Sequence, residues 1–188
     1  MYRYLFAALA LFVTTPAWAG SVDASINDSS VNVTLGWVQN NKSPDALQIQ
    51  LGYLTNLQRN SVISAGVQVI GETGKSDNPL ELGVGFKFLG VDSASSGLLY
   101  GLALGVELRY YPKNINRLAL TTQLNYGPNV VVSSPAESMM ELGVRAEYQI
   151  LPQAFAYAGF RTFDIGLSGG GNDLIDNGFH VGVRVLFQ

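Results

Sequence analysis

The chain of 188 residues has few charges, many glycines and no cysteine, and these features exclude several classes of protein. Only 13% of the residues are charged, against about 25% in an average soluble domain, and the net charge is −3. The absence of cysteine excludes disulfide bonds, thiol nucleophiles and cysteine metal sites. No basic patch supports nucleic-acid binding. The 21 glycines and the lack of a long apolar run in the mature chain fit alternating strands better than membrane helices.

The N-terminus has the three parts of a secretory signal peptide. Arg3 supplies a positive start, residues 5–13 form an apolar run, and Ala17-Trp18-Ala19 is a small-x-small cleavage site. The apolar run is shorter than the roughly 20 residues that span a bilayer. We therefore predict cleavage after Ala19 and a single mature domain over residues 20–188, with an uncleaved N-terminal anchor as the alternative.

The mature chain contains ten segments in which apolar residues alternate with polar or small ones, the period of a β-strand. The connections at 112–116 and 151–153 are tight, whereas those at 127–137 and 168–177 are longer. This asymmetry and the even number predict an all-β, antiparallel transmembrane β-barrel of ten strands, with eight as the alternative count. The segments are residues 22–27, 31–38, 47–53, 61–71, 80–88, 100–111, 118–126, 140–148, 154–166 and 179–187.

The last segment resembles the C-terminal assembly signal of bacterial outer-membrane β-barrels. The pattern consists of polar His180, Gly182, apolar Val185 and aromatic Phe187, followed here by an additional Gln188. The resemblance implies export to the outer membrane of a Gram-negative bacterium and recognition by the barrel-assembly machinery.

Alternation reveals an apolar face but not the direction in which it points, and a soluble lipocalin-like barrel that binds lipid would turn this face inward. Aromatic residues near both ends of the segments favour lipid outside, because transmembrane barrels carry aromatic girdles at both interfaces. The predicted girdle residues are Trp37, Tyr53, Phe88, Tyr100, Tyr110, Tyr126, Tyr148, Phe155, Phe179 and Phe187.

The opposite face carries small residues and a balanced set of charges, as expected where charges held away from water need partners. Such a lumen is either a set of ion pairs that fills the barrel or a narrow polar pore. A barrel of ten strands is close in size to the eight-stranded barrels whose interior is filled by side chains, which favours the filled barrel. The predicted lumen charges are Glu81, Lys87, Glu107, Arg109, Glu141, Arg145, Glu147 and Arg184.

One catalytic alternative rests on the single histidine, His180, which the pattern places on the polar face near the outer end of the last strand. A hydrolase of lipid A or phospholipid could combine it with Ser168 and with Glu141 or Glu147. A simpler interpretation is a hydrogen-bonded lumen histidine. The loop 168–177 resembles one calcium-binding turn, but a single imperfect copy predicts a flexible surface loop, so we expect neither a metal nor a cofactor.

Four stretches together are similar to the YfaZ family of Gram-negative proteins. This resemblance implies an outer-membrane β-barrel without an assigned activity. For such a barrel we expect a monomer in contact with membrane lipids and lipopolysaccharide. Residues 75–79 look like an insertion relative to the family. The four stretches are residues 20–23, 105–112, 141–148 and 178–184.

Overall fold

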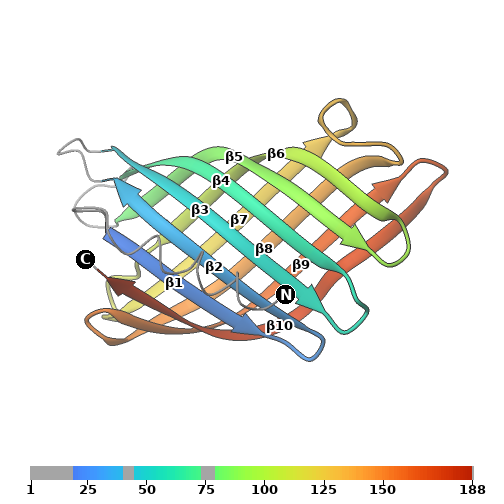
Figure 1. The fold of residues 1–188 in the computed structure, drawn as a ribbon. Helices are drawn as coiled ribbons and strands as arrows, with labels where there is room; N and C mark the ends of the chain where they lie inside the picture. Colours follow the sequence, from blue (N-terminus) through green and yellow to red (C-terminus); the bar gives the residue numbers. More distant parts are fainter. Residues whose placement is uncertain (1–18, 40–44, 73–78, 188) are drawn as a thin grey trace, which may run out of the picture.

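A computed structural model describes residues 19–39, 45–72 and 79–187, which form ten strands in a closed antiparallel barrel (Figure 1). The prediction of ten strands is confirmed, and the alternative count of eight is wrong. The strands are β1 Ala19–Ile26, β2 Ser30–Gln39, β3 Asp45–Asn56, β4 Ser61–Glu72, β5 Leu80–Ser93, β6 Gly97–Tyr110, β7 Leu118–Pro128, β8 Ala136–Leu151, β9 Ala154–Leu167 and β10 Gly171–Phe187, with a short 3₁₀ helix η1, Asn129–Val131, before β8.

Several sequence predictions lie outside the described residues. They are the signal peptide up to residue 18, the insertion from residue 75 to 78 and the final Gln188. Among the described residues, no helix has the length and apolarity needed to cross a membrane.

The barrel closes where the first strand pairs with the last. Gly20 lies opposite Phe187 and Ile26 lies opposite Val181 in an antiparallel register, and every other strand pairs with its neighbours in sequence. Closure leaves no unpaired strand edge, which a strand exposed to lipid requires. We call the end of the barrel that contains Ala19 and Phe187 the terminal end. The opposite end, where β1 turns into β2 and β9 into β10, is the hairpin end.

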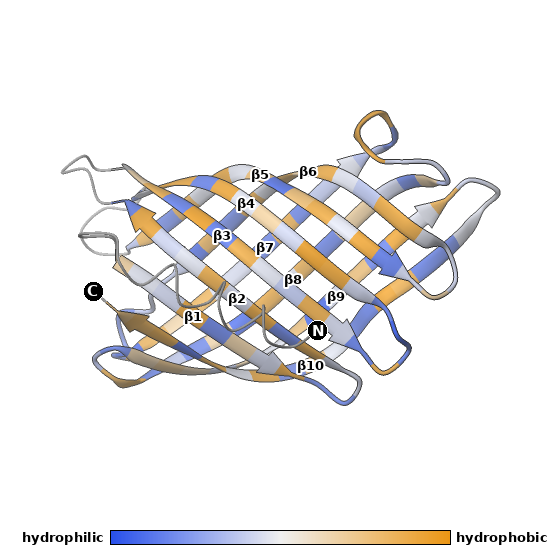
Figure 2. Cartoon of the chain, viewed as in Figure 1, coloured by the Kyte–Doolittle hydropathy of each residue, from blue (hydrophilic) through white to orange (hydrophobic). Residues whose placement is uncertain are grey.

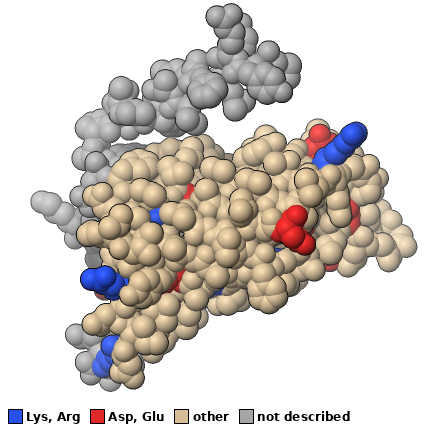
Figure 3. Space-filling view, turned by 90° about the horizontal axis from the view of Figure 1, so that it is seen from below, with Lys and Arg blue, Asp and Glu red and all other residues tan. Residues whose placement is uncertain are grey.

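The two faces of each strand differ in chemistry, and the apolar face points outward. Along β6, for example, Tyr100, Leu104 and Leu108 are exposed, whereas Ala103, Gly105 and Glu107 between them are buried. Apolar residues alternate along the strands in Figure 2, and charged side chains in Figure 3 gather mainly toward the barrel ends. The alternative of a lipocalin-like barrel with an apolar interior is therefore contradicted along the middle of the barrel.

The strands are longer at the hairpin end than the sequence suggests. The predicted loop 168–177 is wrong, because β9 continues to Leu167 and β10 begins at Gly171, so that only residues 168–170 form the turn. Gly169 and Gly170 adopt positive φ angles of 110° and 85° there, which suits a tight hairpin. Likewise, the connection predicted at 127–137 shortens to residues 129–135, and only residues 94–96 separate β5 from β6.

Apolar side chains fill the interior at the hairpin end, and we call this group the apolar plug. A β-bulge between Leu174 and Asp176 turns both Ile175 and Asp176 inward, so that Ile175 of β10 completes the group. Among the described residues, the packed apolar core therefore lies at the hairpin end. The plug consists of Leu54, Val62, Leu89, Val91, Leu99, Ala103, Ala136, Met139, Phe163, Ile165 and Ile175.

Candidate functional site

The two larger cavities among the described residues lie in the polar interior, between the apolar plug and the terminal end. The chamber, in the middle of the barrel, has a volume of about 120 Å³. The vestibule, of about 840 Å³, lies at the terminal end and is lined by Phe187 and by the turn between β6 and β7. Four residues line both cavities and form the boundary between them: Ser21, Gln48, Arg109 and Arg184.

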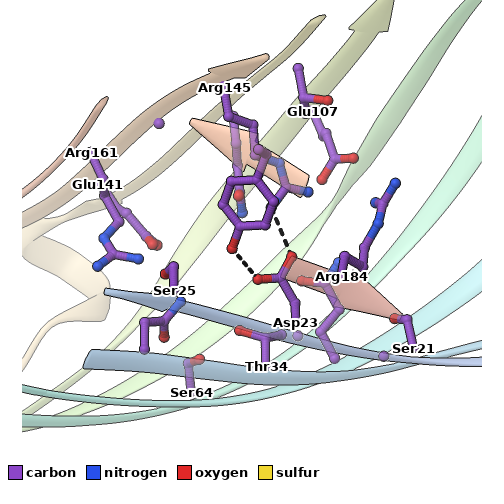
Figure 4. A pocket seen from close by; sticks show the side chains of 18 of the residues that line it. Ser21, Asp23, Ser25, Thr34, Ser64, Glu107, Glu141, Arg145, Arg161 and Arg184 are labelled. Carbon is purple, nitrogen blue, oxygen red and sulfur yellow. Dashed lines mark hydrogen bonds and ion pairs between the residues drawn. The ribbon is translucent and has the colours of Figure 1, made fainter. Parts of the chain in front are cut away.

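The chamber has two chemically different walls. The wall formed by β5 to β10 carries most of the charge, including Glu107, Arg145 and Arg161 (Figure 4). The wall formed by β1 to β4 carries Asp23 and is otherwise uncharged. We call its hydroxyl and amide side chains the neutral wall: Ser21, Ser25, Asn32, Thr34, Gln48, Gln50 and Ser64.

Glu147 is the centre of the ion-pair network. Its carboxylate is fully buried and lies 2.6 Å from Nε of Arg145, 2.5 Å from Nη2 of Arg184 and 3.7 Å from Nη2 of Arg109. The Thr121 hydroxyl also donates a hydrogen bond to it, at 3.4 Å. One carboxylate therefore holds three guanidinium groups from three strands, which ties β6, β8 and β10 together through the lumen.

Other pairs extend the network along the barrel. Nη1 of Arg145 donates to Asp23 at 3.0 Å, and the Tyr157 hydroxyl donates to the other oxygen of the same carboxylate. Nζ of Lys87 lies 2.6 Å from Glu141. These contacts cross the lumen, since β5 with β8 and β8 with β1 are not neighbouring strands.

A third cluster lies next to the plug. Nε of Arg161 donates to Oδ2 of Asp176 at 2.6 Å, and Asn27 and Ser30 donate to Oδ1 of the same carboxylate. The bulge in β10 is what turns Asp176 inward.

All eight charges predicted for the lumen lie on the interior face of the barrel. The prediction missed Asp23, Arg161 and Asp176. Asp23 stands between Val22 and Ala24 in an alternating segment, so its face could have been read from the pattern. The other two could not, because segment 154–166 has no regular alternation that would assign Arg161 to a face, and Asp176 lies in the predicted loop 168–177.

One predicted girdle residue is on the wrong face. Phe155 lies inside the barrel, where its ring packs against the guanidinium of Arg184 with 4.9 Å between Cζ and the ring centre. The alternation of β9 places Phe155 on the same face as Tyr157, Arg161 and Phe163. The other nine predicted girdle residues lie on the outward face, with Trp37 half-buried and the rest exposed.

His180 does not lie near the outer end of its strand, because β10 extends nine residues beyond it to Gly171. It lines the chamber and meets the Tyr157 ring edge-on at 5.9 Å between ring centres. Ser168 lies in the turn at the hairpin end, where its hydroxyl donates to the Pro135 carbonyl at 3.0 Å. The structure therefore does not bring the predicted serine and histidine together.

A hydrogen-bonded clasp crosses the mouth of the barrel at the hairpin end. Oδ2 of Asp173 in β10 accepts hydrogen bonds from the hydroxyls of Ser93, Ser95 and Ser96 at 2.5, 2.6 and 2.9 Å. These serines belong to the end of β5 and the turn after it. The strand order places β5 and β10 on opposite sides of the ring. Nδ2 of Asn56 in β3 also donates to the Ile175 carbonyl, at 2.7 Å.

At the terminal end, Tyr111 follows the last residue of β6 and lines the vestibule. Burial raises the pKa of its phenol to about 12, against the opposing effect of Arg109 and with support from Glu81. The protonated hydroxyl donates to Oε1 of Glu81 at 3.0 Å. Within the described ranges, no group of three histidine, aspartate or glutamate residues is placed to hold a metal ion.

Solved structures with a similar fold are outer-membrane proteins. The KdgM porin in complex with disordered oligogalacturonate is 10% identical with a TM-score of 0.50, and the match covers 90% of this chain and 99% of that one. The outer membrane channel DcaP of Acinetobacter baumannii is 9% identical with a TM-score of 0.49, and 88% of this chain spans 54% of that channel. At such identities the likeness concerns the fold alone. No curated protein matches this chain.

The comparison with protein families gives a match over nearly the whole chain. The model described as YfaZ precursor matches residues 1–187, and the word precursor fits the predicted signal peptide. The chain therefore belongs to the YfaZ family of porin-like outer-membrane β-barrels.

Proposed function

We propose that this protein is a resident outer-membrane barrel of a Gram-negative bacterium that is closed to the outside and has a structural or accessory role. The observation that carries the proposal is the apolar plug beneath the clasp. Its members Val91, Leu99 and Ile165 are fully buried, so no water-filled path passes between them. An ion crossing this layer would lose its hydration without gaining a partner, at a cost of many kcal/mol.

The orientation follows from the ends of the chain. Both termini of bacterial outer-membrane barrels lie on the periplasmic side, which places the vestibule toward the periplasm and the clasp outside. The polar exterior of the strand ends near Asn172 and Asn177 suits an aqueous environment beyond the lipid. We propose a monomer, because all strand edges are paired within one chain. Its outward aromatic residues would contact outer-membrane lipids and lipopolysaccharide, and β10 would be read by the barrel-assembly machinery.

A narrow pore is the second candidate function. The ion pairs that line the chamber and the open vestibule would provide a charged path if the plug moved aside. The fully buried plug favours the closed barrel over this candidate. A lipid hydrolase has less support, because Ser168 and His180 lie in different parts of the barrel.

Swelling of proteoliposomes distinguishes the closed barrel from the pore. Liposomes that contain the refolded protein should swell in arabinose no faster than protein-free liposomes, because the sugar cannot pass the plug. Liposomes with a general porin provide the positive control, and heat-modifiable migration on a gel verifies folding of the inserted protein. Swelling that falls steadily with the size of the sugar would show an open pore and would overturn the proposal.

A further inference from the structure

The chamber has the size of a binding site for a small molecule and shares a boundary with the vestibule. A buried water needs roughly 10–15 Å³ of such space, so a cavity of about 120 Å³ is large enough for a molecule of several heavy atoms. Arg109 and Arg184 belong to the boundary that it shares with the vestibule, which is seven times larger and lies at the terminal end. A small solute that moves between these side chains would reach the chamber without passing the apolar plug.

Four buried side-chain atoms of the chamber wall make no hydrogen bond: Nδ1 of His180, Oγ of Ser25, and Nε of Arg145 and of Arg184. His180 is 7% exposed, and its Nδ1 makes no hydrogen bond. An unsatisfied buried polar group costs about 1–3 kcal/mol, and native structures seldom leave one without a protein, water or ligand partner. The free Nδ1 therefore points to a hydrogen-bonding occupant of the chamber.

The ion pairs decide the charge of that occupant. Every charged residue that lines the chamber has a partner of opposite sign: Lys87 with Glu141, Arg109 with Glu107, Arg145 with Asp23, Arg161 with Asp176 and Arg184 with Glu147. A charged ligand would have to break one of these pairs or remain without a counter-charge in a poorly hydrated site. The neutral wall opposite offers hydroxyl and amide groups, which match uncharged hydroxyl groups as both donors and acceptors.

From the volume, the free imidazole nitrogen and the neutral wall, we propose that the chamber binds a small uncharged polyol of about the size of glycerol. The ligand enters from the vestibule, accepts or donates a hydrogen bond at His180 Nδ1 and makes its other hydrogen bonds to the neutral wall. This function goes beyond a structural role, and it does not require the hairpin end to open.

The chain is well suited to a direct test because His180 is its single histidine. Protein labelled with ¹⁵N-histidine and refolded in detergent micelles gives imidazole signals from this residue alone. Titration with glycerol should shift these signals in a saturable manner. Glycerate, an anion of similar size, and sorbitol, a larger polyol, should each bind at least tenfold more weakly than glycerol.

Two glycine variants separate chamber binding from a general solvent effect. Gly143 lines the chamber, and a Cβ added there meets no atom within 4 Å, so Gly143→Leu places a side chain in the space without a backbone clash. Gly171 has equal room at the hairpin end and serves as the matched control. Gly143→Leu should weaken glycerol binding at least tenfold, and Gly171→Leu should leave it unchanged. Thr34→Val, which removes one hydroxyl from the neutral wall at nearly constant volume, is a second variant that should weaken binding.

Four results would overturn the proposal: no shift with glycerol, a linear response to glycerol, an equal response in Gly143→Leu and Gly171→Leu, or binding of glycerate as tight as that of glycerol. The first of these would show that the chamber holds water only. Both barrel ends are accessible in micelles, so the result does not depend on closure of the hairpin end. If the protein binds glycerol and also lets sugars pass in the liposome assay, the proposed closed barrel is contradicted but the proposed binding site is supported.

Discussion

Replacing Glu147 by glutamine is expected to lower the free energy of unfolding by about 3–5 kcal/mol, the usual cost of removing one partner from a buried ion pair. Glutamine has nearly the same shape but no charge, so the guanidinium groups of Arg145 and Arg184, at 2.6 and 2.5 Å, would lose their shared carboxylate. The measurement is urea unfolding of the protein in lipid vesicles, followed by the fluorescence of Trp37, which is the single tryptophan of the predicted mature chain.

Glu137→Gln is the matched control for this change. Glu137 belongs to the same strand, β8, but is exposed at the hairpin end. Its replacement should alter the free energy of unfolding by no more than about 0.5 kcal/mol, as is typical of surface sites. Equal stability of the two variants would show that Glu147 does not organise the lumen.

Leu104→Arg should destabilise the barrel by about 2–4 kcal/mol, the cost of an arginine on the lipid face near the middle of the bilayer. Leu104 lies in the middle of β6 and is 56% exposed on the outward face, opposite Phe86 and Tyr126 of the neighbouring strands. The same vesicle unfolding experiment measures the effect.

Leu98→Arg tests whether depth in the membrane causes that loss. Leu98 lies on the same face of the same strand and is 74% exposed, but it stands at the hairpin end. An arginine there should cost only about 0–1 kcal/mol, since lipid-face penalties fall toward the interfaces. A similar loss in both variants, or no loss at Leu104, would contradict a membrane-spanning outward face.

The fold could be predicted from the sequence because the two faces of most strands differ so strongly. Segments such as 100–111 alternate without interruption, and period two in ten segments permits few architectures other than a barrel. Strand boundaries were harder to predict at the hairpin end. Residues 172–177 are polar and resemble a loop in composition, yet Asn172 and Asp173 pair with Gly166 and Ile165 of β9. Where a strand extends beyond the lipid, its outward residues need not be apolar, so the alternation that predicts a strand is absent there.

The interior was only partly predictable for a related reason. Charged residues on the inner face stand out in the sequence, but which of them meet across the barrel depends on strand order and register. The apolar plug was missed because its members interrupt the alternation. The signal was present in adjacent apolar residues such as Phe88-Leu89, Leu98-Leu99 and Met139-Met140, in which one residue of each pair faces outward and the other fills the interior. The side chain of Ile175 points inward because of the β-bulge between Leu174 and Asp176, and no sequence pattern predicted this bulge.

Single-channel recording in planar bilayers tests the closed barrel most directly. Wild-type protein whose insertion has been verified should give no steady conductance, and Arg109→Ala and Glu107→Ala should also remain silent, because both residues lie on the terminal side of the apolar plug. Steady wild-type channels whose ion selectivity shifts with either substitution would contradict a plugged lumen. They would establish this protein as a narrow pore lined by its ion pairs.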